Sequence, residues 1–152
     1  MLKIVCVGKI KEKYLTDAFS EYEKRMNAFQ KMKVVEVKES NNKDLSHNLE
    51  EEANLILSNI TNDEYVITLE ILGQMIDSIE LADKIAKLQT YGKTNITFVI
   101  GGSCGLHDKV KQRSNYALSF SKMTFPHQLM RVILIEQIYR AFTIINNREY
   151  HK

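Results

Sequence analysis

The sequence predicts an α/β protein with a mostly parallel sheet and helices on both faces. Short apolar runs typical of buried strands alternate along the chain with amphipathic segments typical of helices, and this order favours parallel strands. The chain has 152 residues, the size of one ordinary domain, so we expect residues 1–152 to form a single domain. Hydrophobic residues make up 44% and charged residues 26%, a balance typical of soluble globular proteins rather than disordered chains.

The strands are predicted from short apolar runs that are rich in β-branched residues. Most of these runs are followed by glycine or polar residues; the first ends at Gly8, and the third leaves through Gly73. In chain order, the predicted strands are residues 2–7, 33–37, 65–69, 96–100 and 117–120.

The helices are predicted from apolar residues that recur at helical spacing. Asp77, followed three residues later by Glu80, predicts the cap of the third helix, and Gly92 predicts its end. Pro126 opens the last helix, because proline suits a first helical turn. The predicted helices span about 15–26, 49–60, 77–91, 108–116 and 127–144, with a polar loop at 38–46 and a polar, aromatic tail at 145–152.

Charge and cysteine content exclude several classes of protein. The net charge of +2 is only mildly basic, so any contact with nucleic acid must use a local patch. Cys6 and Cys104 lack the spacing of metal ligands, as do the four histidines, and we expect no metal site and a reduced, cytoplasmic protein. No apolar run reaches the roughly 18 residues that a membrane span requires, so we expect no membrane partner.

A glycine-rich turn marks the most informative stretch of the chain. Three glycines lie within five residues, from Gly101 to Gly105, directly after an apolar strand. A second loop, residues 120–126, follows the next strand, and two loops at the carboxyl ends of neighbouring strands form a ligand pocket in such folds. The turn matches neither the P-loop nor the dinucleotide fingerprint, and a purely structural turn is an equally good interpretation.

The last helix is apolar on nearly all sides, which predicts burial on more than one face. One side would cover the sheet and the other a second subunit; the alternative is a central core helix. Glu136 and Arg140 form an i,i+4 pair on it. The tail at 147–152 combines an aromatic ring, a histidine and two cations, and composition alone favours a nucleotide-gripping role and simple fraying equally.

Together these segments resemble the RlmH-type ribosomal RNA large-subunit methyltransferases of the SPOUT class. The resemblance covers the whole chain and is most specific from Phe98 onward. It is carried by the stretches Ile67–Glu70, Phe98–Ser103, Ser119–His127, Arg131–Val132, Glu136–Ala141 and Tyr150–Lys152.

The resemblance implies a sheet threaded by a C-terminal trefoil knot and an obligate homodimer in which one subunit's tail reaches the other's site. It also implies an enzyme that uses S-adenosyl-L-methionine to methylate N3 of a pseudouridine in the 23S rRNA of the assembled ribosome. The position of Cys104 departs from the family pattern, so we assign that residue no catalytic role.

The same resemblance implies two groups of site residues. The catalytic group contains His151 and Glu136 as candidates to take the proton of N3, with Arg140, Tyr150 and Arg131 available to hold phosphate or to stack on a base. The cofactor-binding group contains Leu69, Gly101, Phe120, Ser121, Lys122, Met123, Thr124 and Phe125.

Two other functions stay open at this point. One is a non-enzymatic ribosome- or RNA-binding factor on the same fold. The other is a small nucleotide-binding domain that uses the glycine turn for phosphate, against which the missing P-loop lysine counts.

Overall fold

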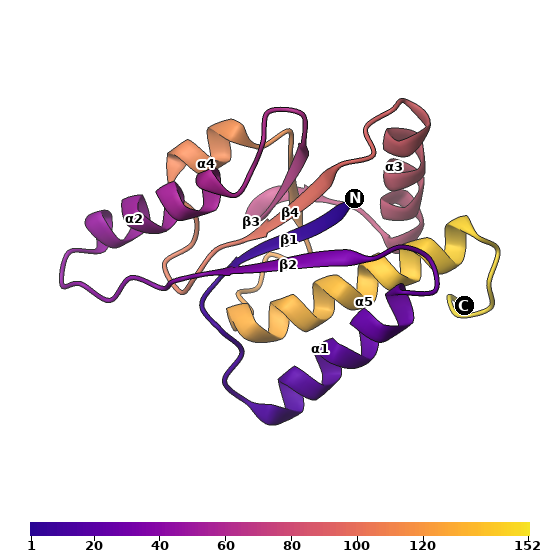
Figure 1. Ribbon diagram of the computed structural model, residues 1–152, viewed down its shortest axis with the longest axis horizontal. Coiled ribbons are helices and arrows are strands. Elements are labelled where there is room, and N and C mark those ends of the chain that lie inside the picture. The colour runs from indigo at the N-terminus through magenta and orange to yellow at the C-terminus, as the bar shows by residue number, and fades with distance from the viewer.

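A computed structural model describes residues 1–152, and its centre is a five-stranded sheet in which all neighbouring strands are parallel (Figure 1). The strand order across the sheet is β2-β1-β4-β3-β5. The strands are β1 (Leu2–Val7), β2 (Met32–Val37), β3 (Tyr65–Met75), β4 (Ile96–Ile100) and β5 (Tyr116–Ser119). The helices are α1 (Lys13–Met26), α2 (Leu45–Ser58), α3 (Ser78–Thr90), α4 (Asp108–Arg113) and α5 (His127–Ile145).

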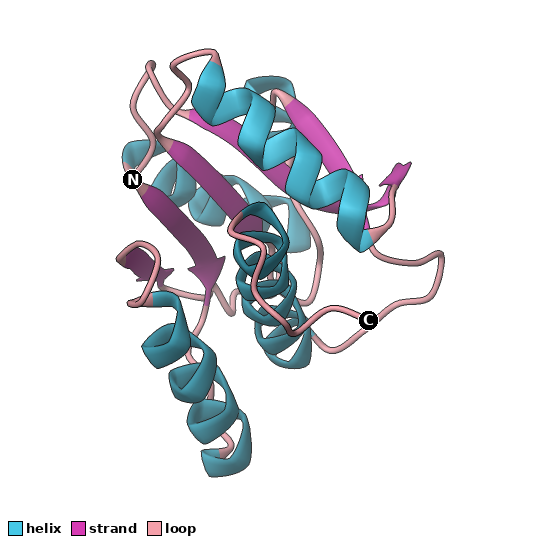
Figure 2. Cartoon of the chain, turned by 90° about the vertical axis from the view of Figure 1, so that its right-hand side faces the viewer, coloured by secondary structure: helices cyan, strands magenta, loops and turns pink.

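Helices cover both faces of this sheet, as the alternation of strand and helix predicts (Figures 1 and 2). Successive strand residues point to opposite faces, so that on β4 Phe98 packs with α1, α3 and α5, whereas Val99 packs with α2 and α4. The fold class predicted from the sequence is therefore confirmed. The C-terminal trefoil knot stays a prediction.

The last helix, α5, contacts α1 along one side and α3 along the other. Leu129 is the only exposed residue on it. Other helices of the same chain therefore cover much of the apolar surface of α5 that the sequence assigned to a second subunit. For the covered surface, the alternative of a central core helix is correct. None of the helices is both long enough and apolar enough to cross a membrane.

Strand β3 is longer than the sequence predicts. It continues past Leu69 to Met75, with a break in register between Leu69 and Gln74 where it pairs with β5. Gly73 does not lead out of the strand but packs against β5, and a Cβ on Gly73 would lie 2.8 Å from the carbonyl carbon of Ala117. Pairing with β5 therefore extends β3 beyond its apolar run.

Two helix boundaries also differ from the prediction. Helix α2 begins at Leu45, inside the predicted loop, because the side chain of Asp44 accepts hydrogen bonds from the backbone of Ser46 and His47. Helix α4 ends at Arg113, because β5 begins at Tyr116. The cap of α3 is confirmed: the carboxylates of Asp77 and Glu80 each accept a hydrogen bond from the other's backbone N–H.

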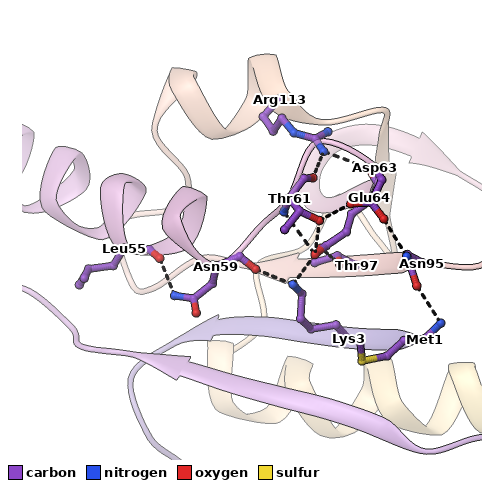
Figure 3. Close-up of polar contacts among 10 residues, drawn as sticks. All are labelled: Met1, Lys3, Leu55, Asn59, Thr61, Asp63, Glu64, Asn95, Thr97 and Arg113. Atoms are coloured by element: carbon purple, nitrogen blue, oxygen red, sulfur yellow. Dashed lines mark hydrogen bonds and ion pairs between the residues drawn. The ribbon is translucent and has the colours of Figure 1, made fainter.

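A buried ion pair holds the amino edge of the sheet together (Figure 3). Lys3 on β1 is 7% exposed, and its ammonium donates to Oε1 of Glu64 at 2.7 Å and to the carbonyl oxygen of Asn59 at 2.5 Å. The hydroxyl of Thr97 donates to the other carboxylate oxygen of Glu64. Burial raises the pKa of Glu64, but the hydrogen bonds from Lys3 and Thr97 outweigh it, so that the net shift is downward. This edge joins β1, β4 and the start of β3.

Candidate active site

A cavity with a volume of about 530 Å³ lies at the opposite, carboxyl edge of the sheet. Three chain segments form most of it: residues 69–71 of β3, residues 100–106 after β4, and residues 118–127 after β5. This volume lies within the range of small-molecule sites, and carboxyl edges are where parallel α/β sheets bind ligands. The position of the pocket agrees with the sequence prediction.

Seven of the eight residues proposed to bind a cofactor line this cavity; Lys122 does not and is exposed to solvent. The seven are Leu69, Gly101, Phe120, Ser121, Met123, Thr124 and Phe125. The structure thus brings together residues that are more than fifty positions apart in the chain.

The glycine turn after β4 leaves no room for a side chain at Gly101. A Cβ on Gly101 would lie 2.5 Å from the carbonyl oxygen of Gly105, which is closer than real Cβ contacts allow. Gly105 has a φ of +82°, in the left-handed region that favours glycine, and its N–H donates to the carbonyl oxygen of Gly102 at 3.1 Å. The three glycines therefore present bare backbone to the cavity.

The third wall is fastened to β3 by hydroxyl groups. The hydroxyl of Ser119 lies 2.9 Å from the carbonyl oxygen of Ile71 and 3.0 Å from that of Ser121. The hydroxyl of Ser121 in turn accepts a hydrogen bond from the N–H of Met123 at 3.0 Å. These contacts hold residues 119–123 against the extended part of β3.

Arg131, proposed to hold RNA, is buried instead, and that prediction is wrong. Its side chain is 2% exposed, and Nη1 donates to the carboxylate of Glu36 at 2.7 Å. Nη2 donates to the carbonyl oxygens of Val7 and Gly8, at 3.3 and 3.0 Å. Arg131 therefore fastens the start of α5 to the ends of β1 and β2, where no RNA reaches it.

The tail folds back onto α5 through a tight helix-ending turn. Asn147 adopts a φ of 52°, and its N–H donates to the carbonyl oxygen of Ile144 at 3.2 Å. The N–H of Arg148 donates to the carbonyl oxygen of Thr143 at 2.8 Å, which completes a Schellman motif. The tail is held by the helix, and the alternative of simple fraying is wrong.

This turn brings the four residues proposed as catalytic into one cluster. The hydroxyl of Tyr150 donates to Oε1 of Glu136 at 2.9 Å, and its ring meets that of Tyr139 edge-on, with centroids 4.8 Å apart. The guanidinium of Arg140 pairs with Glu136 and lies 4.7 Å from the ring centroid of Tyr150. Nη1 of Arg140 is 3.2 Å from Nδ1 of His151.

The charge states within this cluster follow from its contacts. Burial first, and then hydrogen bonds to Tyr22 and Glu136, raise the pKa of Tyr150 above its usual range, so the phenol stays neutral. The hydrogen bond to Glu136 raises the pKa of Arg140, which stays cationic. Nε of Arg140 is buried and has no hydrogen-bond partner in the chain.

The cavity and the tail cluster lie apart along α5. Met130 lines the cavity, whereas Arg140 lies ten residues further along the helix, a rise of about 15 Å. Methyl transfer requires the reacting atoms to be about 3–3.5 Å apart. Within a single chain, the cavity and the tail cluster are therefore too far apart to act on the same reacting atoms.

Several residues that line the cavity lie outside the proposed cofactor-binding group, and two of them, Glu70 and His127, carry chemistry. Glu70 directly follows Leu69, and no motif marks its role. His127 is the first residue of α5, which has no side-chain cap bond, and it lines the cavity. The position of both residues beside the predicted loops was the only signal available.

An all-parallel α/β sheet with a glycine-lined cavity at its carboxyl edge is the arrangement in which proteins of this fold class bind small ligands. The family model described as "Predicted SPOUT methyltransferase" matches residues 1–151. The chain therefore belongs to the SPOUT methyltransferase family.

Relatives agree with this assignment, and a solved structure shares the fold. A Bacillus pumilus protein named Ribosomal RNA large subunit methyltransferase H is 50% identical over 157 residues, covering 99% of both chains. A Methanococcus vannielii protein with a name of the same kind is 55% identical over the same span and coverage. The structure of a methylase family protein from Haemophilus influenzae Rd KW20 matches with a TM-score of 0.57 at 17% identity, covering 99% of this chain and 70% of that one, and shows the fold alone.

Proposed function

We propose that this protein transfers a methyl group from S-adenosylmethionine to N3 of a pseudouridine in 23S rRNA of the assembled ribosome. It acts in the cytoplasm as a homodimer of single-domain subunits. The observation that carries this proposal is the bare-backbone cavity at the carboxyl edge of a SPOUT-family sheet. The names of relatives at 50 and 55% identity support ribosomal RNA as the substrate.

The cavity fits the methyl donor. A flat, largely apolar base with an attached ribose needs a slot in which backbone can approach closely, and the Gly101–Gly105 turn provides one. Leu69 and Phe120 supply apolar walls on either side of the turn. When bound, the cofactor supplies an electrophilic methyl group on a sulfonium sulfur. The chain's own task is then to hold the target nucleotide in line with that group.

A second copy of the chain completes the site. The separation of about 15 Å along α5 prevents the tail cluster of one subunit from reaching its own cavity. Exposed apolar side chains support a subunit interface near the cavity: Leu72 is 98% exposed and Met123 is 72% exposed, with Ile71, Met75, Ile79 and Leu129 also exposed. The tail of one subunit therefore acts at the cavity of its partner.

The contact between His151 and Arg140 supports a role for His151 as a hydrogen-bond donor. Arg140 carries only N–H donors, so Nδ1 of His151 accepts, and the proton of the neutral ring lies on Nε2. That N–H donates to a carbonyl oxygen beside N3, where negative charge develops as the N3 proton leaves to an oriented water. The unpartnered Nε of Arg140 adds positive charge at the same place.

Glu136 orients this cluster rather than taking the proton. Its Oε1 accepts from Tyr150 and Arg140, and its Oε2 accepts from Nε2 of Gln137 at 2.9 Å. These three donors engage both carboxylate oxygens of Glu136. We assign it the role of holding Arg140 and Tyr150 in place.

Transfer of a labelled methyl group tests the activity. The purified protein is incubated with labelled S-adenosylmethionine and ribosomes from a strain that lacks this modification, and rRNA is digested to locate the label. Incorporation at N3 of a single pseudouridine supports the proposal. Ribosome binding without incorporation, and without calorimetric heat from the cofactor, would support the non-enzymatic alternative instead.

Mixed dimers test the shared site. One subunit carries Gly101→Val, which displaces the turn that lines the cavity, and the other lacks residues 150–152. With the tail acting at the partner's cavity, the purified heterodimer has one intact site and about half of wild-type activity, although each parent homodimer is inactive. An inactive heterodimer would place tail and cavity in the same subunit.

A further inference from the structure

Glu70 is the only Asp, Glu, Lys or Arg residue among those that line the cavity. The other lining residues are apolar, glycine or hydroxyl-bearing, apart from His127. A single carboxylate in so apolar a cavity sets its electrostatic preference, because charges interact more strongly where water is excluded. The cavity is therefore biased toward a ligand with positive charge.

A buried hydroxyl group holds the carboxylate in position. Oγ1 of Thr68, which is fully buried on β3, donates to Oε2 of Glu70 at 2.6 Å. Oγ1 of Thr68 also lies 2.8 Å from Oγ of Ser114, which lies 3.0 Å from the carbonyl oxygen of Tyr116. Oε1 of Glu70 has no hydrogen-bond partner in the chain. One carboxylate oxygen is thus fixed, while the other is free for a ligand.

We propose that Glu70 is a specificity-determining residue that makes the cavity prefer the sulfonium form of the cofactor over the demethylated product. This inference rests on the proposed function. S-Adenosylmethionine and S-adenosylhomocysteine share the base, the ribose and the amino-acid end, but only the former carries a positive charge on sulfur. A carboxylate fixed in the cavity attracts that charge and gains nothing from the neutral thioether. The product is then bound more weakly and leaves after transfer.

Calorimetric titration of the full-length protein tests this inference, with three probes: S-adenosylmethionine, S-adenosylhomocysteine and sinefungin, which carries an ammonium in place of the sulfonium. In Glu70→Gln, we expect the Kd of both charged probes to rise about tenfold or more, and that of S-adenosylhomocysteine to change less than about threefold. The control is Asp83→Asn, which removes an equal charge from an exposed ion pair with Lys87 on α3. This variant should leave the Kd of all three probes unchanged.

A second variant tests the anchoring. Thr68→Val keeps the charge of Glu70 but removes the hydroxyl that holds it, so the preference for charged probes should fall partway toward that of Glu70→Gln. The charge role of Glu70 would be overturned if Glu70→Gln, with the wild-type circular dichroism spectrum, lost equal affinity for all three probes. It would also be overturned if this variant lost no affinity for any of them. If the wild-type protein binds none of the probes, the proposed function fails first.

Discussion

The hydroxyl of Tyr150 donates a hydrogen bond to Oε1 of Glu136 at 2.9 Å, across a gap of fourteen residues in the sequence. The contact joins the last residues of the chain to the middle of α5, and Arg140 packs its guanidinium over the same tyrosine ring. The sequence alone does not decide whether the tail is ordered. In the structure these contacts hold its aromatic ring and its imidazole beside the guanidinium of Arg140.

Deletion of residues 150–152 should separate activity from folding. The deletion removes Tyr150 and His151 from the tail cluster but leaves both hydrophobic cores intact, so we expect a loss of only about 1 kcal/mol of stability from the lost aromatic contact. Methyl transfer should fall at least about a hundredfold. Thermal unfolding and labelled-methyl incorporation measure the two effects. Glu149→Gln, at an exposed position in the same tail, is the control and should keep its activity.

The assignment of His151 as a hydrogen-bond donor predicts different outcomes for two substitutions. His151→Gln keeps an N–H donor and should retain a tenth or more of the wild-type turnover number. His151→Ala removes the donor and should lose about a hundredfold, the typical cost of a missing oxyanion donor. Single-turnover rates on modification-deficient ribosomes measure both. Equal losses in the two variants would argue that the ring does more than donate.

The buried guanidinium of Arg131 should matter for stability rather than for RNA binding. Arg131→Met removes the donors to Glu36 and to the carbonyl oxygens of Val7 and Gly8, so we expect the free energy of unfolding to fall by about 3 kcal/mol. Urea denaturation measures the change. Arg25→Met removes an exposed guanidinium paired with Glu21, and its loss of stability should be much smaller. Equal losses would contradict the anchoring role.

The ion pair of Lys3 and Glu64 should make stability depend on pH in the acid range. The pKa of Glu64 is lowered in the folded protein, so below its ordinary value of 4.5 the unfolded chain binds the proton more readily. The stability from this carboxylate is therefore present at neutral pH and is lost as the pH falls from 4.5 through the folded pKa.

Urea denaturation between pH 7 and pH 3 measures how far the free energy of unfolding falls on acidification, which we call the acid limb. Glu64→Gln should be less stable than wild type at pH 7 and should lose less further stability on acidification. Glu21→Gln, which breaks an exposed pair, should keep the wild-type acid limb. A Glu64→Gln protein with an unchanged acid limb would mean that the pair contributes nothing.

The strand pattern and the location of the cavity could be predicted because they depend on local signals. Apolar runs such as Phe98–Ile100 define buried strands, and the glycine turn that follows places bare backbone at the end of such a strand. The capping residues Asp77 and Glu80 likewise act within one helical turn. In each case the residues that determine the structure lie next to one another in the chain.

The features that the sequence did not reveal depend on partners that are distant in the chain. The end of β3 depends on pairing with β5 across Gly73, and the burial of Arg131 depends on carbonyl groups more than 120 residues away. Thr68, which anchors Glu70, lies beside Ser114 only in the folded protein. Neither hydropathy nor spacing reports such contacts.

A crystal structure of the protein with S-adenosylmethionine or sinefungin tests the central claim most directly. The account predicts one ligand per chain in the cavity at the carboxyl edge, with its base against the Gly101–Gly105 turn and its walls formed by residues 69–71 and 120–125. Electron density for the ligand at any other place, or an empty cavity at saturating ligand, would contradict it.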